Sequence, residues 1–503
     1  MTEPISDRFK DLPEITAEEI RVMIESGRVY FTRRAVGEDA LSAILNEAVF
    51  KGIPVEADDS LIEGDLDFAD GPRVTLEEVT INQDIKRRLQ ESGITSVVVL
   101  NGGLTFNGSY IKGMMSAQDT IFIGSFSFKE ATFSEEVDLD FATFCSEVAF
   151  FDGTKFINNS SFKRSIFGGM AYFLRAKFYG ETSFWGADFD ENAQFGMSTF
   201  GSNVSFERTT FGKEAIFIST TFSKEAYFFS TTFARATHFT GSNFKGPVIF
   251  QGLGELRLPV IRNGMELRLE VVDENFVFEG EVDFRRVTLD DPDKVRFQHV
   301  DLSKVRFLET RLDRVRLIDV KWAEREERKA IYDEEFAEEE GYELVAQLYR
   351  QLKKNYEEER DYPGAGDFHY GEMEMMLKQQ HQEWEKETKK SQKCKNWFTW
   401  FLTSSYKFLS GYGEKAERAI VITLAILLAG VPFYFFDKLT AATLEGIWSA
   451  FWDALISSMG YMTFRLTKVP TSWWAKPVLA VQAVLGPIQL ALLALALRRK
   501  FRR

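Results

Sequence analysis

The chain has 503 residues, of which 45% are hydrophobic and 27% are charged, and it contains 12 Pro and only 2 Cys. This composition excludes a disordered chain, a collagen-like fibre and a disulfide-stabilised scaffold, and the length predicts more than one domain. The net charge of −15 argues against a protein that binds nucleic acid over its whole surface, because such a surface carries an excess of Lys and Arg.

The N-terminal region is expected to be helical and to stay in the cytoplasm. Met1 to Glu19 mixes charged and polar side chains and contains no apolar stretch of signal-peptide length. From Ala17 to Lys51 the apolar residues recur at helical spacing. We therefore expect residues 1–60 to form a helical cap in front of a repeat that follows.

Phenylalanine recurs with a fixed period in the next region. One series runs from Phe167 to Phe244 in steps of eleven residues, and a second, from Phe173 to Phe250, interleaves with it at offsets of six and five. A helix would spread these rings around its surface, and a flat strand cannot run so far. The period therefore predicts a solenoid in which each face turns one ring into the core. We interpret the rings as core packing rather than as a cofactor site.

The spacing of the inward residues changes upstream and downstream of this stretch. The series through Phe133, Phe144 and Phe156 contains one step of twelve, which predicts a one-residue insertion at a corner. Weaker coils are expected from Asp65 onwards, and residues 251–275 interrupt the pattern. The spacing then shortens to five residues at Phe297, Leu302, Phe307, Leu312 and Leu317.

These residues resemble the pentapeptide-repeat family. In that family a central Leu or Phe, and a small residue two places before it, point into a right-handed, four-sided β-helix. The resemblance implies such a β-helix over residues 61–322, irregular at 251–275. The chain departs from the family in having Phe at most central positions and, in the last run, Val or Thr where Ala is usual.

A charged helical connector is expected over residues 323–417. Apolar residues recur at helical spacing on both sides of Asp361 to Gly366, where Pro and Gly predict the turn of a helical hairpin. Glu324 to Glu340 is strongly acidic, and we interpret it as a solvated face. The connector ends with Lys389, Lys390, Lys393 and Lys395, followed by Trp397, Phe398, Trp400 and Phe401. Basic residues followed by aromatic ones are typical of a segment at a membrane surface.

The last region, residues 418–503, contains two stretches that are long and apolar enough to cross a membrane, 419–436 and 477–497. Their outer flanks are basic, which predicts a multi-pass protein of the cell (inner) membrane with both termini in the cytoplasm. The apolar stretch 447–464 lies between them, and a third crossing would put one basic flank on the wrong side. We therefore expect a re-entrant pore helix there.

Two spans around a re-entrant helix resemble the two-transmembrane pore domain of potassium channels. The matching residues are Phe451 to Ser457 for the pore helix, and Gly486 and Pro487 at the place of an inner-helix gating hinge. Together with the repeats, the helical hairpin, Ser410 to Glu414 and the basic C-terminus, they resemble the bacterial pentapeptide-repeat ion-channel proteins. The resemblance implies a homotetramer in a lipid membrane that conducts an inorganic ion.

The selectivity filter has two alignments. One uses Ser457 to Met462, with Met462 in place of the second glycine, and the other uses Met462 to Thr467 and contains no glycine. Arg465 and Lys468 either form a positive ring at the pore mouth, which would favour anions or weak selectivity, or point to the extracellular surface. The pore candidates are Ser457, Ser458, Gly460, Tyr461, Met462, Thr463, Phe464 and Arg465.

Three functions are weighed on this basis. The first is an ion channel whose solenoid is a scaffold or gating element. The alternative is a membrane-tethered scaffold without conduction, whose solenoid binds a cytosolic protein. An enzyme is not expected, because the 4 His residues are not paired at ligand spacing and no catalytic residue, metal site or cofactor is indicated. The widely separated Cys145 and Cys394 are expected to be reduced.

Overall fold

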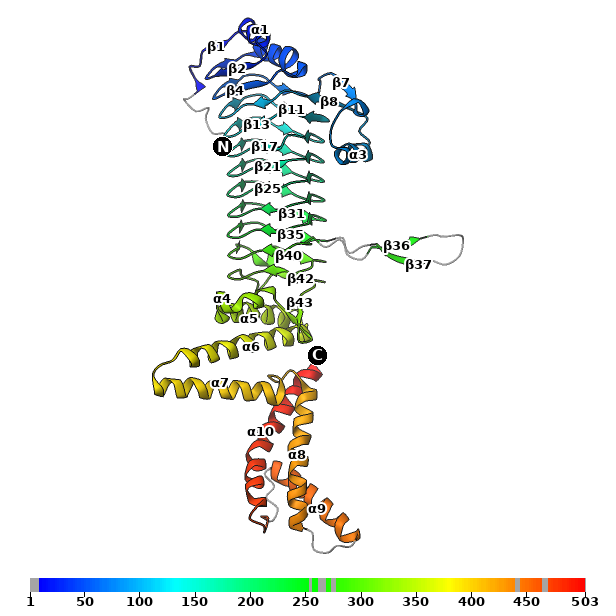
Figure 1. Cartoon of the computed structure of the whole chain (residues 1–503), viewed down its shortest axis with the longest axis vertical. Coiled ribbons are helices and arrows are strands. Elements are labelled where there is room, and N and C mark those ends of the chain that lie inside the picture. Colours follow the sequence, from blue (N-terminus) through cyan, green and yellow to red (C-terminus); the bar gives the residue numbers. More distant parts are fainter. Residues whose placement is uncertain are drawn as a thin grey trace. The chain divides into compact units, whose positions relative to one another are not determined.

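The computed structural model describes residues 9–252, 256–260, 268–272, 277–438, 444–463 and 469–502, which fall into two compact units. The solenoid unit comprises residues 1–324 and 331–333, and the helical unit comprises 325–330 and 334–503. Figure 1 shows short strands stacked along the first unit and long helices in the second.

The solenoid unit has four faces. Its strands form four long sheets of 11, 10, 8 and 11 strands, in which nearly all pairs are parallel. One coil runs through β22 (Lys177–Phe178), β23 (Thr182–Ser183), β24 (Asp188–Phe189) and β25 (Ala193–Gln194), one strand on each face. The next strand, β26 (Thr199–Phe200), pairs in register with β22. The period of two eleven-residue units per coil is thereby confirmed, as is the β-helical solenoid.

The predicted insertion lies between two inward phenylalanines. Strand pairs that span it are offset by 23 residues, as in Phe126↔Ala149. Pairs before it and after it are offset by 22, as in Ile121↔Thr143 and Ala149↔Ala171. The buried rings of Phe144 and Phe151 bracket the extra residue. The chain therefore absorbs one more residue at a corner without losing the register of the coils.

Columns of stacked aromatic rings fill the inside of the solenoid. In one column the ring centroids of Phe156, Phe178 and Phe200 are 4.7 and 4.8 Å apart and nearly parallel. Neighbouring columns meet edge to face, as Phe184 and Phe195 do at 5.4 Å. From Phe167 to Phe250 the residue two places before each ring is a buried Ala, Ser, Thr or Val. Its hydroxyl, where it has one, is often paired: Thr209 donates to the carbonyl of Phe184 at 2.7 Å. The core is closely packed.

The N-terminal segment is not the continuous helical cap that its spacing predicts. Helix α1 (Ala17–Glu25) is followed by β2 (Val29–Thr32), whose residues are alternately buried and exposed. Strands β1 (Glu14–Ile15) and β3 (Ala35–Val36) already join one of the long sheets. The cause is local, because Gly27 adopts a left-handed backbone (φ +83°) and ends the helix before a β-branched and aromatic stretch. The coils therefore begin well before residue 61.

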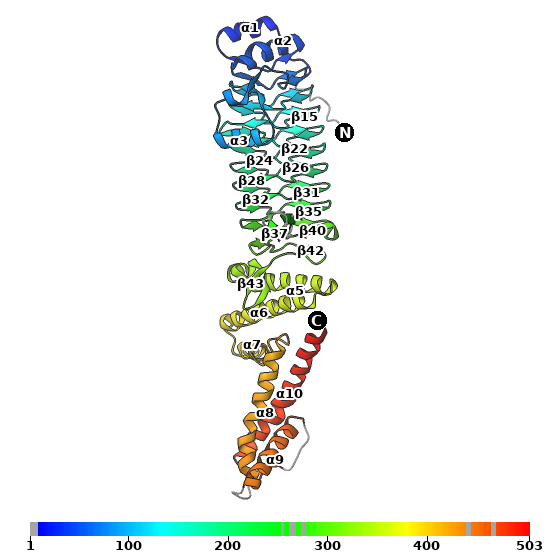
Figure 2. The same ribbon diagram turned by 90° about the vertical axis from the view of Figure 1, so that its right-hand side faces the viewer.

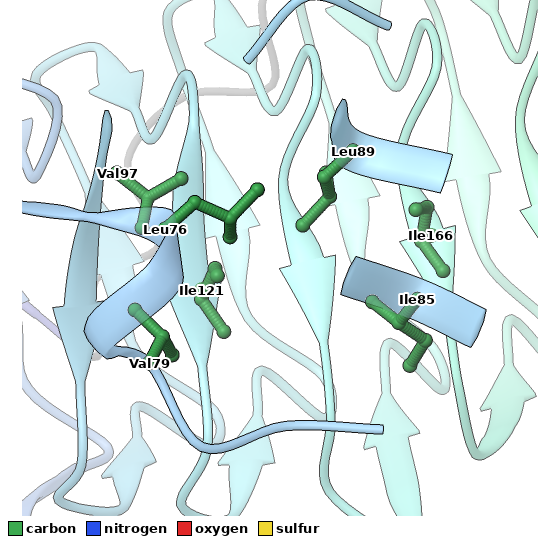
Figure 3. Packing of buried hydrophobic residues seen from close by; sticks show 7 residues of the cluster. All are labelled: Leu76, Val79, Ile85, Leu89, Val97, Ile121 and Ile166. Atoms are coloured by element: carbon green, nitrogen blue, oxygen red, sulfur yellow. The ribbon is translucent and has the colours of Figure 1, made fainter. Parts of the chain in front are cut away.

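A nine-residue helix, α3 (Gln83–Glu91), lies on the outside of one face. It belongs to an excursion between β6 (Leu66–Asp67) and β8 (Ser96–Leu100). Its Ile85 and Leu89 belong to one buried cluster with Ile121 and Ile166 of the coil wall, and Figure 3 shows both of them beside Ile166. Arg88 binds both Asp188 and Asp190. A second excursion contains the antiparallel pair β36 (Leu256–Val260) and β37 (Arg268–Val272), within the segment expected to be irregular.

The helical unit contains the predicted hairpin, formed by α5 (Tyr342–Glu358) and α6 (Tyr362–Lys386). The turn is shorter than expected, because Asp361 caps the amide of Gly364 at 3.0 Å and Pro363 fits in the first helical turn. Helices α7 (Lys390–Ser410), α8 (Ala416–Lys438), α9 (Leu444–Met462) and α10 (Ala475–Arg502) follow, as Figure 2 shows from the side.

The acidic segment that precedes the hairpin is partly buried, unlike the solvated face expected from its composition. Within the helical unit, the buried carboxylate of Glu334 accepts from the Arg328 guanidinium at 2.8 Å and from the Tyr349 hydroxyl. Arg328 belongs to β44 (Arg328–Ala330) and Tyr349 to α5. The Glu334 carboxylate thus links β44 to α5. A charge buried in this way requires such partners, because an unpaired one is strongly destabilising.

Candidate functional site

Helices α8 and α10 are long and apolar enough to cross a membrane, over Ala416–Lys438 and Ala475–Phe501. In the most apolar 18-residue stretch of each helix, only 22% and 17% is buried inside the protein. The core helix of a soluble protein would be mostly buried. Their exposed side chains include Leu424, Leu428, Val481, Val484 and Ile488. Surfaces of this kind are stable in lipid rather than in water. The chain is therefore a membrane-associated protein, and the two stretches predicted as spans lie inside these helices.

Helix α9 packs against both of these helices at the place where a pore helix is expected. Its Ala454 and Tyr461 join Val431 and Tyr434 of α8 and Ala475 of α10 in one buried cluster. The rings of Tyr434 and Tyr461 are 5.0 Å apart. The three helices therefore form one packed bundle, not two spans with a loose linker.

A buried polar network crosses this bundle. The side-chain amide of Gln482 in α10 donates to the Ser458 hydroxyl of α9 at 3.0 Å and accepts from the Tyr434 hydroxyl of α8 at 2.8 Å. Ser458 in turn donates to the carbonyl of Leu427 at 2.7 Å. Gln482 and Ser458 are 3% and 0% exposed, so each must satisfy its polar atoms inside the bundle. The sequence indicates Ser458 as a site residue, but Tyr434 was missed because its partner is 48 residues away.

The filter candidates Ser457, Ser458, Gly460, Tyr461 and Met462 all lie in the last two turns of α9. The carbonyls of Met459 and Gly460 accept from the amide of Thr463, the remaining described candidate. An extended filter over Ser457 to Met462 is therefore not the conformation of this chain. The physical reason is that a single glycine does not interrupt a helix whose other residues are compatible with it. Phe464 and Arg465, with most of the second alignment, lie outside the described residues.

The hinge candidates Gly486 and Pro487 lie inside α10, which continues through both. A Cβ atom on Gly486 would be 2.7 Å from the Cα of Met462. The glycine therefore permits the last turn of α9 to approach the backbone of α10. This contact gives Gly486 a packing role that the sequence does not reveal.

The basic end of α10 is bound to the turn that precedes α8. Gly411, Tyr412 and Gly413 all have positive φ. The carbonyl of Tyr412 accepts from the Tyr406 hydroxyl at 2.7 Å and from the Arg499 guanidinium at 3.1 Å. Arg499 also pairs with Glu414. Burial, and next the Glu374 carboxylate, raise the pKa of Tyr412. The turn was not singled out as a site from its sequence, since Gly-Tyr-Gly is too short to be specific.

The hairpin presents a second charged cluster close to this turn. Glu372 of α6 binds Arg350 and Lys353 of α5 at 2.8 and 2.7 Å. Burial raises the pKa of Glu372, but hydrogen bonds from His369, Lys353 and Arg350 outweigh it and lower the value to about 2. A cavity of about 230 Å³ opens beside them, lined by Lys353, Glu357, Tyr362, Ala365, Gly366, His369, Glu414 and Arg499. The positive and negative side chains of its wall are already paired with one another in part, so the cavity does not specify a ligand charge.

Among the described residues no group of three or more His, Cys, Asp or Glu side chains is placed to hold a metal ion. Comparison with known proteins adds no identity: no family model, no curated protein and no solved structure matches the chain. The resemblance to pentapeptide-repeat channels therefore rests on the residues, their spacing and the order of the modules.

Proposed function

We propose that the helical unit forms an oligomeric, ion-conducting pore in the inner membrane, with the β-helix as its cytoplasmic scaffold or gating element. The observation that carries the proposal is the network of Gln482, Ser458 and Tyr434 within an apolar bundle. Polar side chains are costly inside a membrane, and those that face a bundle interior generally serve transport or packing of a functional site.

Conduction requires several copies of the chain. In the part of the chain that the structure describes, the bundle of one copy consists of α8, α9 and α10, which are too few to surround a water-filled path. Helix α9 exposes Trp448, Trp452, Ile456 and Met459, which are available to pack against neighbouring copies. The resemblance to two-transmembrane channels favours a homotetramer. The basic flanks, from Arg498 at the end of α10 and Arg418 at the start of α8, favour a cytoplasmic position for both termini.

The proposed pore is weakly selective or anion-permeable. Because Ser457 to Met462 are helical, their carbonyls do not form the ring that strips water from potassium. The nearby Arg465 would place one positive charge per copy at the pore mouth, and a ring of such charges repels cations.

The test is planar-bilayer recording of the full chain in asymmetric salt. We expect steady currents whose reversal potential is shifted toward that of chloride, and we expect Arg465→Gln to move it toward the cation potential. Lys476→Gln is the matched control. It removes a positive charge just after the segment that joins α9 to α10, and it should leave the reversal potential unchanged.

A second variant locates the path. In a Cys394→Ser background, Thr463→Cys should make the current sensitive to a charged thiol reagent, because Thr463 is exposed at the end of α9. Silence under all salt, pH and calcium conditions would contradict the pore and favour the alternative, a membrane-tethered scaffold that binds a cytosolic partner through the solenoid.

A further inference from the structure

Helix α7 has two faces of opposite character. One packs on α6: Trp400 stacks on Trp384 with centroids 5.8 Å apart, and Lys407 pairs with Glu374 at 2.7 Å. The other exposes large apolar side chains at helical spacing: Trp397 (41%), Phe398 (54%), Phe401 (47%), Leu402 (52%) and Phe408 (70%). Such a stripe is costly in water, so it indicates an apolar environment around this face.

Charge and chain continuity indicate what that environment is. The start of α7 carries the exposed lysines Lys389, Lys390, Lys393 and Lys395, with no acidic residue among them. Only five residues separate the end of α7 from the start of α8, the first helix able to cross a membrane. Figures 1 and 2 show α7 running across the direction of α8 and not along it. A helix that starts so close to a membrane-spanning helix and runs across its direction lies along the membrane surface, at the depth of the lipid headgroups.

We propose that α7 lies in the cytoplasmic headgroup layer, with its aromatic stripe among the upper acyl chains and its four lysines bound to anionic lipid headgroups. Trp and Phe on one face with Lys beside them is the pattern of interfacial helices, and basic residues next to a span attract anionic lipids. The inference rests on membrane association and does not depend on conduction, so failure of the pore proposal leaves it intact.

The chain carries a built-in position for a reporter. Cys394 is exposed one turn before Phe398, whereas Cys145 is partly buried and its burial raises the pKa of that thiol to about 11. A maleimide fluorophore should therefore label Cys394 selectively, and Cys394→Ser measures any label on Cys145. The labelled full-length protein is placed in detergent, in phosphatidylcholine nanodiscs, and in nanodiscs that also contain phosphatidylglycerol.

In both nanodiscs we expect blue-shifted emission and loss of quenching by aqueous iodide. We also expect quenching by a lipid that is spin-labelled near its headgroup. Each of these three effects should be larger in the nanodiscs that contain phosphatidylglycerol. Reversal of the four lysines to Glu should abolish the difference between the two lipids. The matched control Lys213→Glu/Lys224→Glu, on the solenoid wall, should keep it. Phe398→Asn/Phe401→Asn should restore quenching by iodide.

Two results would overturn the proposal. Iodide quenching in nanodiscs as strong as that of the free fluorophore in buffer would show that α7 stays in water. Protection from iodide without quenching by the lipid label would show that another protein surface, such as a second copy, covers the stripe. Because these comparisons use the unmutated chain, they decide the question even if the lysine variant fails to fold.

Discussion

At the scale of single residues, the coils depend on glycine in two physically different ways. Gly186 is one of a series of corner residues with left-handed backbone, φ +68°, and the equivalent positions are also filled by non-glycine residues such as Met197 and Arg208. Gly180 instead lies where the preceding coil passes closely, because a Cβ atom there would be 2.4 Å from the carbonyl carbon of Asn158. Only the second requires the absence of a side chain.

This difference predicts unequal costs for the same substitution. Gly180→Ala forces apart two coils and should lower the free energy of unfolding by about 2–3 kcal/mol. Gly186→Ala adds only left-handed strain, about 1 kcal/mol. The measurement is denaturant unfolding of the solenoid, followed by circular dichroism. Equal costs, or a larger one for Gly186→Ala, would contradict the close approach at Gly180.

Asp333 gives the solenoid a predictable response to pH. Its buried carboxyl accepts from the amides of Phe307 and Leu308 at 2.9 and 3.0 Å, and burial raises its pKa from 3.8 to about 6 despite these bonds. Between about pH 4 and pH 6, the folded state therefore holds a proton on Asp333 that the unfolded state has released. The contribution of Asp333 to stability falls as the pH rises through this range.

Asp333→Asn removes this titration and keeps an oxygen acceptor. The stability of the natural chain relative to the variant should decrease by about 2–3 kcal/mol between pH 4 and pH 6.5, which is the size that such a pKa shift implies. Unfolding midpoints at several pH values measure it. A difference that is flat, or that grows with pH, would show that the carboxylate is not buried as described.

At the scale of elements, the sequence predicts what repeats and misses what depends on distant partners. The phenylalanine period fixes the inward faces because every coil meets the same neighbours above and below. Helix α3 was not predicted, since it is largely polar and its packing surface at Ile121 and Ile166 belongs to later coils. The same limit holds for the site: Ser458 was a candidate, but its link to Tyr434 through Gln482 appears only in the folded bundle.

A column of rings should tolerate a smaller apolar side chain far better than a void. Phe184 stacks on Phe162 and Phe206 at 4.7 and 5.1 Å and is fully buried. Phe184→Ala should lower the free energy of unfolding by about 3–5 kcal/mol because it leaves a cavity between closely packed coils. The measurement is again denaturant unfolding.

Phe184→Leu is the matched control. Leu139 already occupies an inward, fully buried position among the rings. The leucine variant should therefore cost about 1.5 kcal/mol or less. If both variants cost the same, ring stacking would contribute more to the stability of this core than the avoidance of a cavity does.

At the scale of the whole molecule, the chain passes between its two units more than once. Residues 325–330 belong to the helical unit, whereas 331–333 return to the solenoid unit before the chain enters the hairpin. The short return brings Asp333 to the amides of Phe307 and Leu308, so the natural end of the solenoid lies beyond the last repeat.

This arrangement predicts where the chain can be divided. A fragment ending at residue 336 keeps Asp333 and lacks α7 to α10 with their exposed apolar surfaces, so it should stay soluble without detergent and show the strand signal in circular dichroism. A fragment ending at Glu324 leaves two buried amides without their acceptor, at about 1–3 kcal/mol each. It should therefore unfold at a clearly lower temperature.

Asp333→Ala in the longer fragment separates loss of this carboxylate from loss of chain length. Equal melting of both fragments would mean that the last coil closes without Asp333, and precipitation of the longer fragment would mean that the solenoid requires the helical unit to fold.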